Sequence, residues 1–277
     1  MLVTGSRGRI GAVVAAALRR AGHASIGFDA IDGGDVRDLA AVRRAMRGCQ
    51  AIVHLAALAH DTAGPPADIM AVNVLGTWHV LQAAREAGVE RVVHFSSAQV
   101  LGIMEGERPP DYLPVDDAHP LRASRPYGIS KRLTEEMCDG FTAGTGIPTV
   151  CFRPVWVCDE RTYERIEAAR GRDPAVEWEP FWEYGAHVHV ADVAAAVELA
   201  LTRPLRGHAR LLLCSGQAWT SAPSRDMARR LLPGVPWRGG SEYESEPYRS
   251  LVDASGARER LGWTPRHARP NGRALSG

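Results

Sequence analysis

The alternation of short apolar runs with longer stretches of helical periodicity constrains the fold of this 277-residue chain more than any other feature. The runs are apolar at consecutive positions, which is typical of strands that are covered on both faces. Strands that alternate with helices in this way predict an α/β fold, a doubly wound parallel sheet whose ligand crevice lies at the carboxyl ends of the strands. The predicted strands are Leu2–Thr4, Ala24–Phe28, Ala51–Leu55, Arg91–Ser96, Thr149–Phe152 and Leu211–Cys214.

Glycines stand at every third position between the first predicted strand and the first predicted helix, in the segment Gly5-Ser-Arg-Gly8-Arg-Ile-Gly11. Glycines at these places permit a tight turn, let backbone amides approach a pyrophosphate, and let the helix pack closely on the sheet. A simple turn is the alternative, but strand, loop, helix and second strand follow in the order of a Rossmann-type dinucleotide site. The predicted pyrophosphate-binding residues are Gly5, Gly8, Arg9, Ile10 and Gly11.

A carboxylate, Asp29, ends the second predicted strand 18 residues after Gly11. A carboxylate there binds both ribose hydroxyls of NAD and repels the additional phosphate of NADP. Arg7 and Arg9, in the glycine loop, leave two alternatives open. Either one of them neutralises the charge of the 2′-phosphate of NADP, or both are solvated surface charges. The position of Asp29 favours NAD over NADP.

Helical periodicity between the strands predicts helices at about 10–21, 39–46, 69–87, 125–144 and 189–202, with Gly88 capping the third. The regularity stops near Pro154, and residues 155–186 show only weak periodicity. We therefore expect a dinucleotide-binding domain of residues 1–154, to which residues 187–215 return. Residues 155–186 and 216–277 are expected to form a small, discontinuous C-terminal substrate lobe.

A phenol and an ammonium group stand four residues apart in Tyr127-Gly-Ile-Ser-Lys131. Positions i and i+4 share one face of a helix, so the two side chains are expected to lie together. A phenol titrates near ~10 and becomes an effective proton shuttle at neutral pH only when a nearby cation favours its anion. Lys131 supplies that cation, and the hydroxyl of Ser97, at the end of a parallel strand, is placed to orient a substrate oxygen.

Composition and charge exclude several other classes of protein. The net charge is +1 with both signs interspersed, whereas a nucleic-acid surface needs a concentrated basic face. The apolar runs are too short to span a bilayer and no signal peptide is recognisable, so we expect a cytoplasmic protein. The five scattered cysteines predict reduced thiols, and neither they nor the ten histidines have zinc-motif spacing, so no metal site is expected.

Taken together, the motifs resemble those of extended short-chain dehydrogenases/reductases, specifically the NAD-dependent epimerase/dehydratase family. The resemblance spans nearly the whole sequence, and the order of its motifs is more specific than any one of them. They are Val3–Gly11, Asp35-Val36, His54–Ala57, Asn73–Thr77, Ser96–Val100, Tyr127–Lys131, Arg153-Pro154, His189–Val193 and Leu261–Pro265.

The resemblance implies a role for each matching residue. Ser97, Tyr127 and Lys131 would be the catalytic triad: Tyr127 exchanges a proton with a substrate hydroxyl while a hydride moves to or from the nicotinamide. Asp35 and Val36 would bind adenine, and the backbone at Leu55, Ala56 and Ala57 would line the cofactor. Asn73 would be a buried residue near the cofactor. A homodimer through the helices at about 69–87 and 125–144 is also implied.

Two departures from the family pattern narrow the expected reaction. Ala98 and Gln99 follow Ser97 where the family's dehydratases carry an acidic pair, so 4,6-dehydration is not expected. The segment from Val157 to Gly185 is short compared with that of nucleotide-sugar enzymes, which favours a smaller substrate. We expect an NAD(P)-dependent epimerase or dehydrogenase that acts by hydride transfer at a carbinol of a sugar, sugar acid or nucleotide sugar. A non-catalytic NAD-binding sensor or scaffold on the same fold is the alternative.

The predicted substrate lobe contains two groups of candidate ligand-binding side chains. Its arginines could clamp a phosphate or carboxylate, or be solvated helix charges. Its tryptophans could stack on a sugar or base, or pack in a core. They are Arg161, Arg165, Arg170 and Arg172, and Trp178, Trp182 and Trp237.

Overall fold

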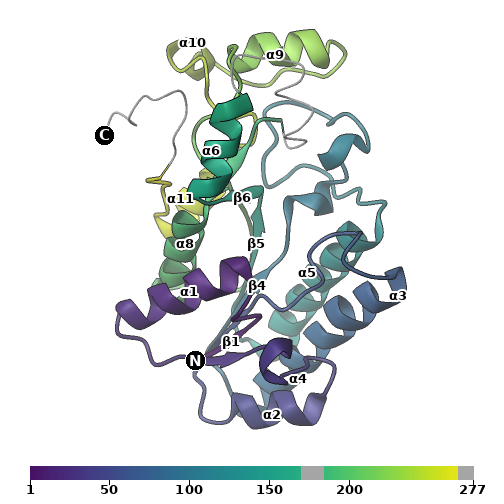
Figure 1. The fold of residues 1–277 in the computed structure, drawn as a ribbon, viewed down its shortest axis with the longest axis vertical. Helices are drawn as coiled ribbons and strands as arrows, with labels where there is room; N and C mark the ends of the chain where they lie inside the picture. The colour runs from purple at the N-terminus through teal and green to yellow at the C-terminus, as the bar shows by residue number, and fades with distance from the viewer. Residues whose placement is uncertain (170–183, 268–277) are drawn as a thin grey trace.

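The computed structural model describes residues 1–169 and 184–267, and a six-stranded parallel sheet lies at its centre (Figure 1). The strand order is β2-β1-β3-β4-β5-β8. Because β1 pairs with β2 on one side and with β3 on the other, the direction of winding reverses between β1 and β3, where a doubly wound fold places its ligand. The predicted fold class is confirmed. The strands are Leu2–Thr4 (β1), Ile26–Phe28 (β2), Ala51–His54 (β3), Arg91–Phe95 (β4), Thr149–Pro154 (β5) and His208–Leu213 (β8).

Helices cover both faces of the sheet, which explains why the strand sequences are apolar at consecutive positions (Figure 1). In β3, for example, Ile52 packs in the core on one face and Val53 packs in the core on the other. The layer on the Val53 side contains α1 (Arg9–Arg20), α8 (Val190–Thr202) and α11 (Ser255–Leu261). The opposite layer contains α2 (Leu39–Met46), α4 (Gly76–Ala87) and α5 (Pro126–Thr145).

The long helix expected at about 69–87 is continuous but changes its winding. It begins as α3 (Pro66–Ile69), widens into the π-helical turn η2 (Met70–Leu75), and continues as α4 until Gly88, whose φ of +65° confirms the predicted cap. A π turn directs side chains differently from an α turn and often marks a functional site. Here it contains Asn73, a residue of the predicted cofactor site.

The last strand of the sheet, β8, begins at His208, three residues before its predicted start at Leu211. The added residues include polar side chains, which the apolar pattern cannot identify as strand. Each is bonded on one side to a neighbouring element: His208 Nδ1 lies 2.6 Å from the Thr149 hydroxyl of β5, and Arg210 donates to Glu136 of α5 at 2.9 Å.

Residues after β5 form structure that the sequence pattern did not predict. β6 (Trp156–Cys158) and β7 (His187–His189) make a separate two-stranded parallel sheet, and α6 (Glu160–Ala169) follows β6. In the view of Figure 1, α6, α9 (Ser224–Leu231) and α10 (Glu242–Ser245) all lie toward the end of the molecule opposite α2. Three short 3₁₀ turns are η1 (Ala30–Asp32), η3 (Ala98–Leu101) and η4 (Met104–Gly106). Within the described ranges, no helix combines the length and apolarity that a membrane crossing requires.

A buried ion pair fastens α5 to the sheet. The Arg153 guanidinium at the end of β5 donates two hydrogen bonds to the Glu135 carboxylate of α5, at 2.8 and 2.7 Å, and the side chains are only 1% and 0% exposed. Ser96, just after β4, donates a further hydrogen bond to Glu135 at 2.6 Å. A buried pair of this kind fixes geometry, because either charge left alone in the interior is strongly unfavourable.

We therefore expect Glu135→Gln to lower the free energy of unfolding by about 3–5 kcal/mol, because it removes the carboxylate charge that is hydrogen-bonded to the buried Arg153 guanidinium. Urea unfolding measures the change. The matched control is Glu136→Gln on the same helix, which removes a 60% exposed partner of Arg210 and should cost less than about 1 kcal/mol. Similar losses in the two variants would contradict the role given to the buried pair.

Candidate active site

A single cavity of about 1330 Å³ follows the carboxyl ends of the strands around the reversal between β1 and β3. Its walls come from the β1–α1 loop, the residues after β2, β3, β4 and β5, and the start of α5. The structure brings all but one of the predicted site residues to its walls, and only Asn73 lies behind them. The lining residues among the predicted set are Gly5, Gly8, Arg9, Ile10, Gly11, Asp29, Asp35, Val36, Leu55, Ala56, Ala57, Ser97, Tyr127 and Lys131.

The glycine loop forms a cradle that larger residues would fill. Gly5 has a φ of +67°, and a Cβ there would lie 2.7 Å from the backbone nitrogen of Ala56. A Cβ on Gly11 would collide with the carbonyl oxygen of Gly5. Helix α1 begins at Arg9, and no side chain caps its N-terminus at Gly8. Its first amides are thus available to an anion, so the loop fits the pyrophosphate of a dinucleotide.

Asp29 follows β2 directly and is 9% exposed at the cavity wall. Its carboxylate accepts hydrogen bonds from the backbone nitrogens of Arg7, at 2.8 Å, and Ile31, at 3.1 Å. Each carboxylate oxygen has a second acceptor position, so both remain able to accept a ribose hydroxyl. The Arg7 guanidinium lies 3.8 Å from the Asp32 carboxylate, and both side chains are more than half exposed.

Asp35 and Val36 line the same end of the cavity, and the structure adds a neighbour that the sequence analysis missed. Arg37 donates to both oxygens of Asp35, at 3.1, 3.0 and 2.6 Å, and these hydrogen bonds lower the pKa of the Asp35 carboxyl. Arg37 also lines the cavity. The Asp35 carboxylate is therefore already paired with a guanidinium at the cavity wall.

Tyr127, Lys131 and Ser97 lie at the other end of the cavity. The Lys131 ammonium is 5.9 Å from the centre of the Tyr127 ring and donates to the carbonyl of Phe95 at 2.7 Å. Burial lowers the pKa of Lys131 to about 8. Ser97 is 8% exposed, and its hydroxyl accepts from the backbone nitrogen of Gln99 at 3.2 Å. The phenol thus has a buried cation beside it and a fixed hydroxyl in the same cavity.

Asn73 holds the wall of the cavity from behind. Its side-chain oxygen accepts from the Leu58 nitrogen at 2.8 Å, and its nitrogen donates to the Leu58 carbonyl at 3.0 Å. The same nitrogen donates to the Ser130 hydroxyl at 2.9 Å, and that hydroxyl donates to the carbonyl of Tyr127 at 2.7 Å. Asn73 therefore connects the loop after β3 to the first turn of α5.

His54 is a buried residue of this site to which the sequence analysis gave no role. Its Nε2 lies 3.0 Å from the Thr77 hydroxyl, which donates its own proton to the Asn73 carbonyl, so Nε2 carries the ring proton. Nδ1 then accepts from the Thr4 hydroxyl at 2.6 Å. Burial lowers the pKa of His54 to about 3, so the ring stays neutral and keeps this direction of hydrogen bonds.

The candidate residues of the lobe have different outcomes. Arg165 of α6 lines the cavity, and Arg161 of the same helix is not among its described lining residues. Trp237 packs edge-on against Tyr243 at 4.9 Å, away from the described cavity wall. Arg170, Arg172, Trp178 and Trp182 lie outside the described residues. Over residues 1–169 and 184–267, no group of His, Cys, Asp and Glu side chains could hold a metal ion.

Comparison with known proteins gives one family. Residues 1–212 match the NAD dependent epimerase/dehydratase family. A UDP-glucose 4-epimerase of Streptomyces lividans is 30% identical over 96% of this chain and 92% of its own. A uronate dehydrogenase of Pseudomonas syringae is 31% identical over 55% of this chain and 58% of its own. A short-chain dehydrogenase/reductase superfamily protein from Agrobacterium tumefaciens, solved with bound NAD, superposes with a TM-score of 0.71 at 26% identity, covering 96% of this chain and 92% of its own.

The position of Asp29 predicts that NAD binds more tightly than NADP and that Asp29→Ala weakens NAD binding and relaxes this preference. Fluorescence titration with each dinucleotide measures both effects, with thermal unfolding to verify the fold. Asp32→Ala, which removes the exposed partner of Arg7, is the matched control and should leave NAD affinity nearly unchanged. If the unaltered protein binds NADP tenfold more tightly (~1.4 kcal/mol), Arg7 or Arg9 governs the choice instead.

Proposed function

The chain belongs to the NAD-dependent epimerase/dehydratase family of short-chain dehydrogenases/reductases, and on this basis we propose that Tyr127 is the proton-transfer residue of a sugar-type epimerase or dehydrogenase. The protein is thus an NAD-dependent enzyme of this family. The observation that carries the proposal is the position of Tyr127. It shares one cavity with the glycine cradle and Asp29 at one end and with Lys131 and Ser97 at its own end.

In the proposed reaction, each residue acts on the substrate oxygen or on the group beside it. Bound NAD supplies the nicotinamide that accepts or returns the hydride. The Tyr127 phenolate takes the proton from the reacting hydroxyl, and in the reverse direction the phenol returns it, while the Ser97 hydroxyl donates a hydrogen bond to the same oxygen. Lys131, 5.9 Å from the ring, stabilises the phenolate form by its charge. Lys131 is buried, and the low polarity around it strengthens that interaction.

Two arginines on the cavity wall favour a substrate with an anionic group. Arg125, just before α5, and Arg165 of α6 both line the cavity, and guanidinium groups bind carboxylates and phosphates. A sugar acid and a nucleotide sugar both carry such a group, as the names of a uronate dehydrogenase and a UDP-glucose 4-epimerase among the relatives illustrate. The short segment after Val157 favours the smaller sugar acid. Ala98 and Gln99 supply no acid for water elimination, so 4,6-dehydration is not part of the proposal.

Tyr127→Phe removes only a hydroxyl, so the fold and NAD affinity should survive while turnover falls by ~10²–10⁴, the usual contribution of a positioned acid or base. Lys131→Met should weaken NAD binding and move the alkaline optimum upward, because the phenol loses its nearby cation. NAD titration and single-turnover hydride transfer, with a panel of sugars, sugar acids and nucleotide sugars, measure these changes.

A Tyr127→Phe enzyme that keeps near wild-type turnover would contradict the assignment. Absence of hydride transfer from every member of the panel, with NAD bound, would favour the sensor or scaffold instead. The three intact residues at one end of the cavity argue against that alternative, because a sensor has no chemical need of them.

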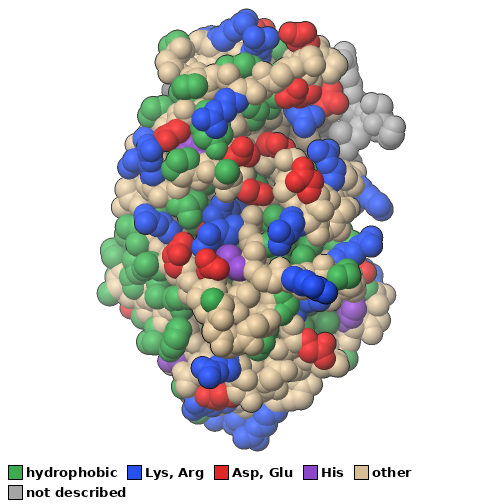
Figure 2. Space-filling view, turned by 180° about the vertical axis from the view of Figure 1, so that it is seen from behind, with side chains coloured by type: hydrophobic (Ala, Val, Ile, Leu, Met, Phe, Trp, Pro, Cys, Tyr) green, Lys and Arg blue, Asp and Glu red, His purple; other side chains and the backbone are tan. Residues whose placement is uncertain are grey.

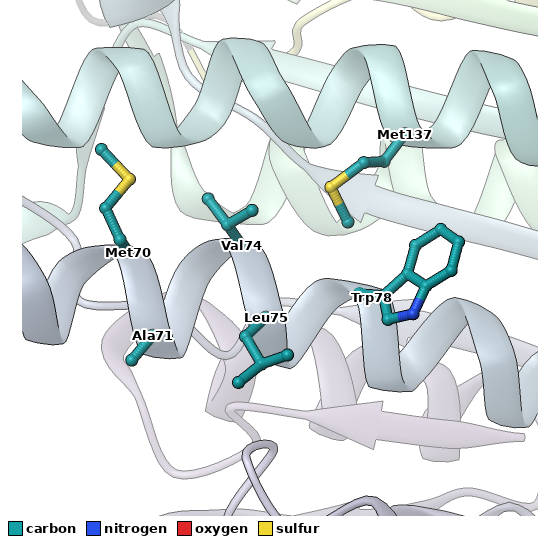
Figure 3. A pocket seen from close by; sticks show the side chains of 6 residues that line it. All are labelled: Met70, Ala71, Val74, Leu75, Trp78 and Met137. Atoms are coloured by element: carbon teal, nitrogen blue, oxygen red, sulfur yellow. The ribbon is translucent and has the colours of Figure 1, made fainter.

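We further propose that the protein is a homodimer whose contact is the outer surface of η2, α4 and α5. An apolar groove of about 520 Å³ lies there between the helices. Figure 3 shows Met70, Val74 and Trp78 on the side of their helix that faces α5, and Met137 directed back from α5. Hydrophobic side chains gather along the left edge of Figure 2, which is the side of α3 and α5 in Figure 1. Leu75, Trp78 and Leu133 are 46%, 54% and 44% exposed, which an isolated chain would leave in water.

Trp78→Glu is expected to convert the dimer to a monomer, because it places a charge in the apolar groove. Analytical ultracentrifugation measures the mass. Ile26→Glu is the matched control: Ile26 is 51% exposed on β2 and does not line the groove, so its replacement should leave the mass unchanged. A monomeric unaltered protein would refute the proposed contact. The cytoplasmic location stays a prediction from the sequence.

A further inference from the structure

Helix α5 lacks the local groups that normally satisfy a helix N-terminus. Its N-cap residue, Arg125, makes no side-chain capping hydrogen bond, and its first turn contains no acidic residue. The first helical residue is Pro126, which has no backbone N–H. The first amide of the helix that needs a partner is therefore that of Tyr127.

Asp61 provides that partner from a distant part of the chain. Its Oδ1 accepts a hydrogen bond from the Tyr127 backbone nitrogen at 2.8 Å, across 66 residues of sequence. Asp61 lies in the loop after β3, which Asn73 holds at Leu58 by two hydrogen bonds. Both Asp61 and Tyr127 line the cavity. The carboxylate thus joins one wall of the cavity to the residue proposed to transfer the proton.

Three acidic residues are among the described lining residues of the cavity: Asp29, Asp35 and Asp61. Of these three, Asp61 is the one that is bonded to Tyr127. The other titratable or charged groups there are His60 on the same loop, Arg125 and Lys131 on α5, and Arg165 on α6. The remaining charged lining residues, Arg9, Asp29, Asp35 and Arg37, lie around the glycine loop and β2. The positive N-terminal end of α5 and Lys131 both favour the phenolate, whereas a carboxylate bonded to the Tyr127 amide opposes it.

We propose that Asp61 is a positioning residue for the proton transfer: it caps α5 at Tyr127, fixing the ring, and its charge opposes that of Lys131 at the phenol. The inference rests on the proposed function of Tyr127. The two charges shift the pH at which the phenol ionises in opposite directions, and the hydrogen bond keeps the start of α5 from fraying into the cavity.

The charge is tested by titrating the Tyr127 phenol in the NAD-bound protein by ultraviolet difference absorbance. The same titration of Tyr127→Phe, subtracted, isolates this phenol from the other tyrosines. Asp61→Asn keeps an oxygen acceptor for the amide and removes the charge, so the midpoint should fall by about half a pH unit. Asp68→Asn, an exposed carboxylate on α3 that does not line the described cavity, should leave it unchanged. An unchanged or raised midpoint in Asp61→Asn overturns the proposal.

The positioning role is tested by turnover on whichever member of the sugar panel reduces NAD. Asp61→Ala should lose about tenfold in turnover with NAD affinity intact, and Asp61→Asn should recover most of it. In the Tyr127→Phe background, Asp61→Ala should cause no further loss, since it acts through the phenol. An equal loss in both backgrounds overturns the proposal for Asp61. Near wild-type turnover of Tyr127→Phe alone contradicts the proposed function instead, so the two failures are distinguishable.

Discussion

The buried polar contacts that fasten α5 to the sheet are the constraint on which the site depends. Glu135 pairs with Arg153 of β5, and Lys131 donates to the Phe95 carbonyl of β4. These groups are removed from water, so each must find its partner or bear a desolvation cost of several kcal/mol. Few placements of the helix satisfy all of them at once. Tyr127 is on the first turn of this helix, and its position relative to the sheet, and hence to the cofactor cradle at the same edge, follows from these contacts.

Burial also determines which groups near the phenol carry charge. His54 and His94 are next to one another on β3 and β4, with ring centres 5.3 Å apart. Burial lowers the pKa of His54 to about 3 and that of His94 well below its ordinary value, and the charge of Lys131 lowers both further. The two rings therefore stay neutral and serve as hydrogen-bonding groups. The cation beside Tyr127 is then the Lys131 ammonium, 5.9 Å from the ring, and its burial strengthens its effect on the phenol.

Patterns within short stretches of sequence predicted the elements whose structure is decided by neighbouring residues. The glycine loop, the apolar strands and the Tyr127–Lys131 pair each lie within a few residues, where backbone conformation and helical spacing decide the structure. Asp61 could not be found in this way, because its partner is 66 residues away and a carboxylate in a loop has no distinctive neighbours. Helix α6 and the β6–β7 pair were missed because their periodicity is weak, and their formation depends on packing among elements distant in sequence.

Helix α5 has a polar inner face and an apolar outer face, and this links the proposed dimer to the proposed site without placing the partner in the cavity. Lys131 and Glu135, one turn apart, face the sheet, whereas Leu133 and Met137, also one turn apart, belong to the outer surface and its groove. A partner that covers the outer face would bury apolar surface on a helix already held on its inner face by charged groups. Its contribution would be to stabilise α5 against local opening. The part of the cavity wall that α5 forms around Tyr127 would then open less often in the dimer than in a monomer. No residue of the second chain needs to contact the substrate for this effect.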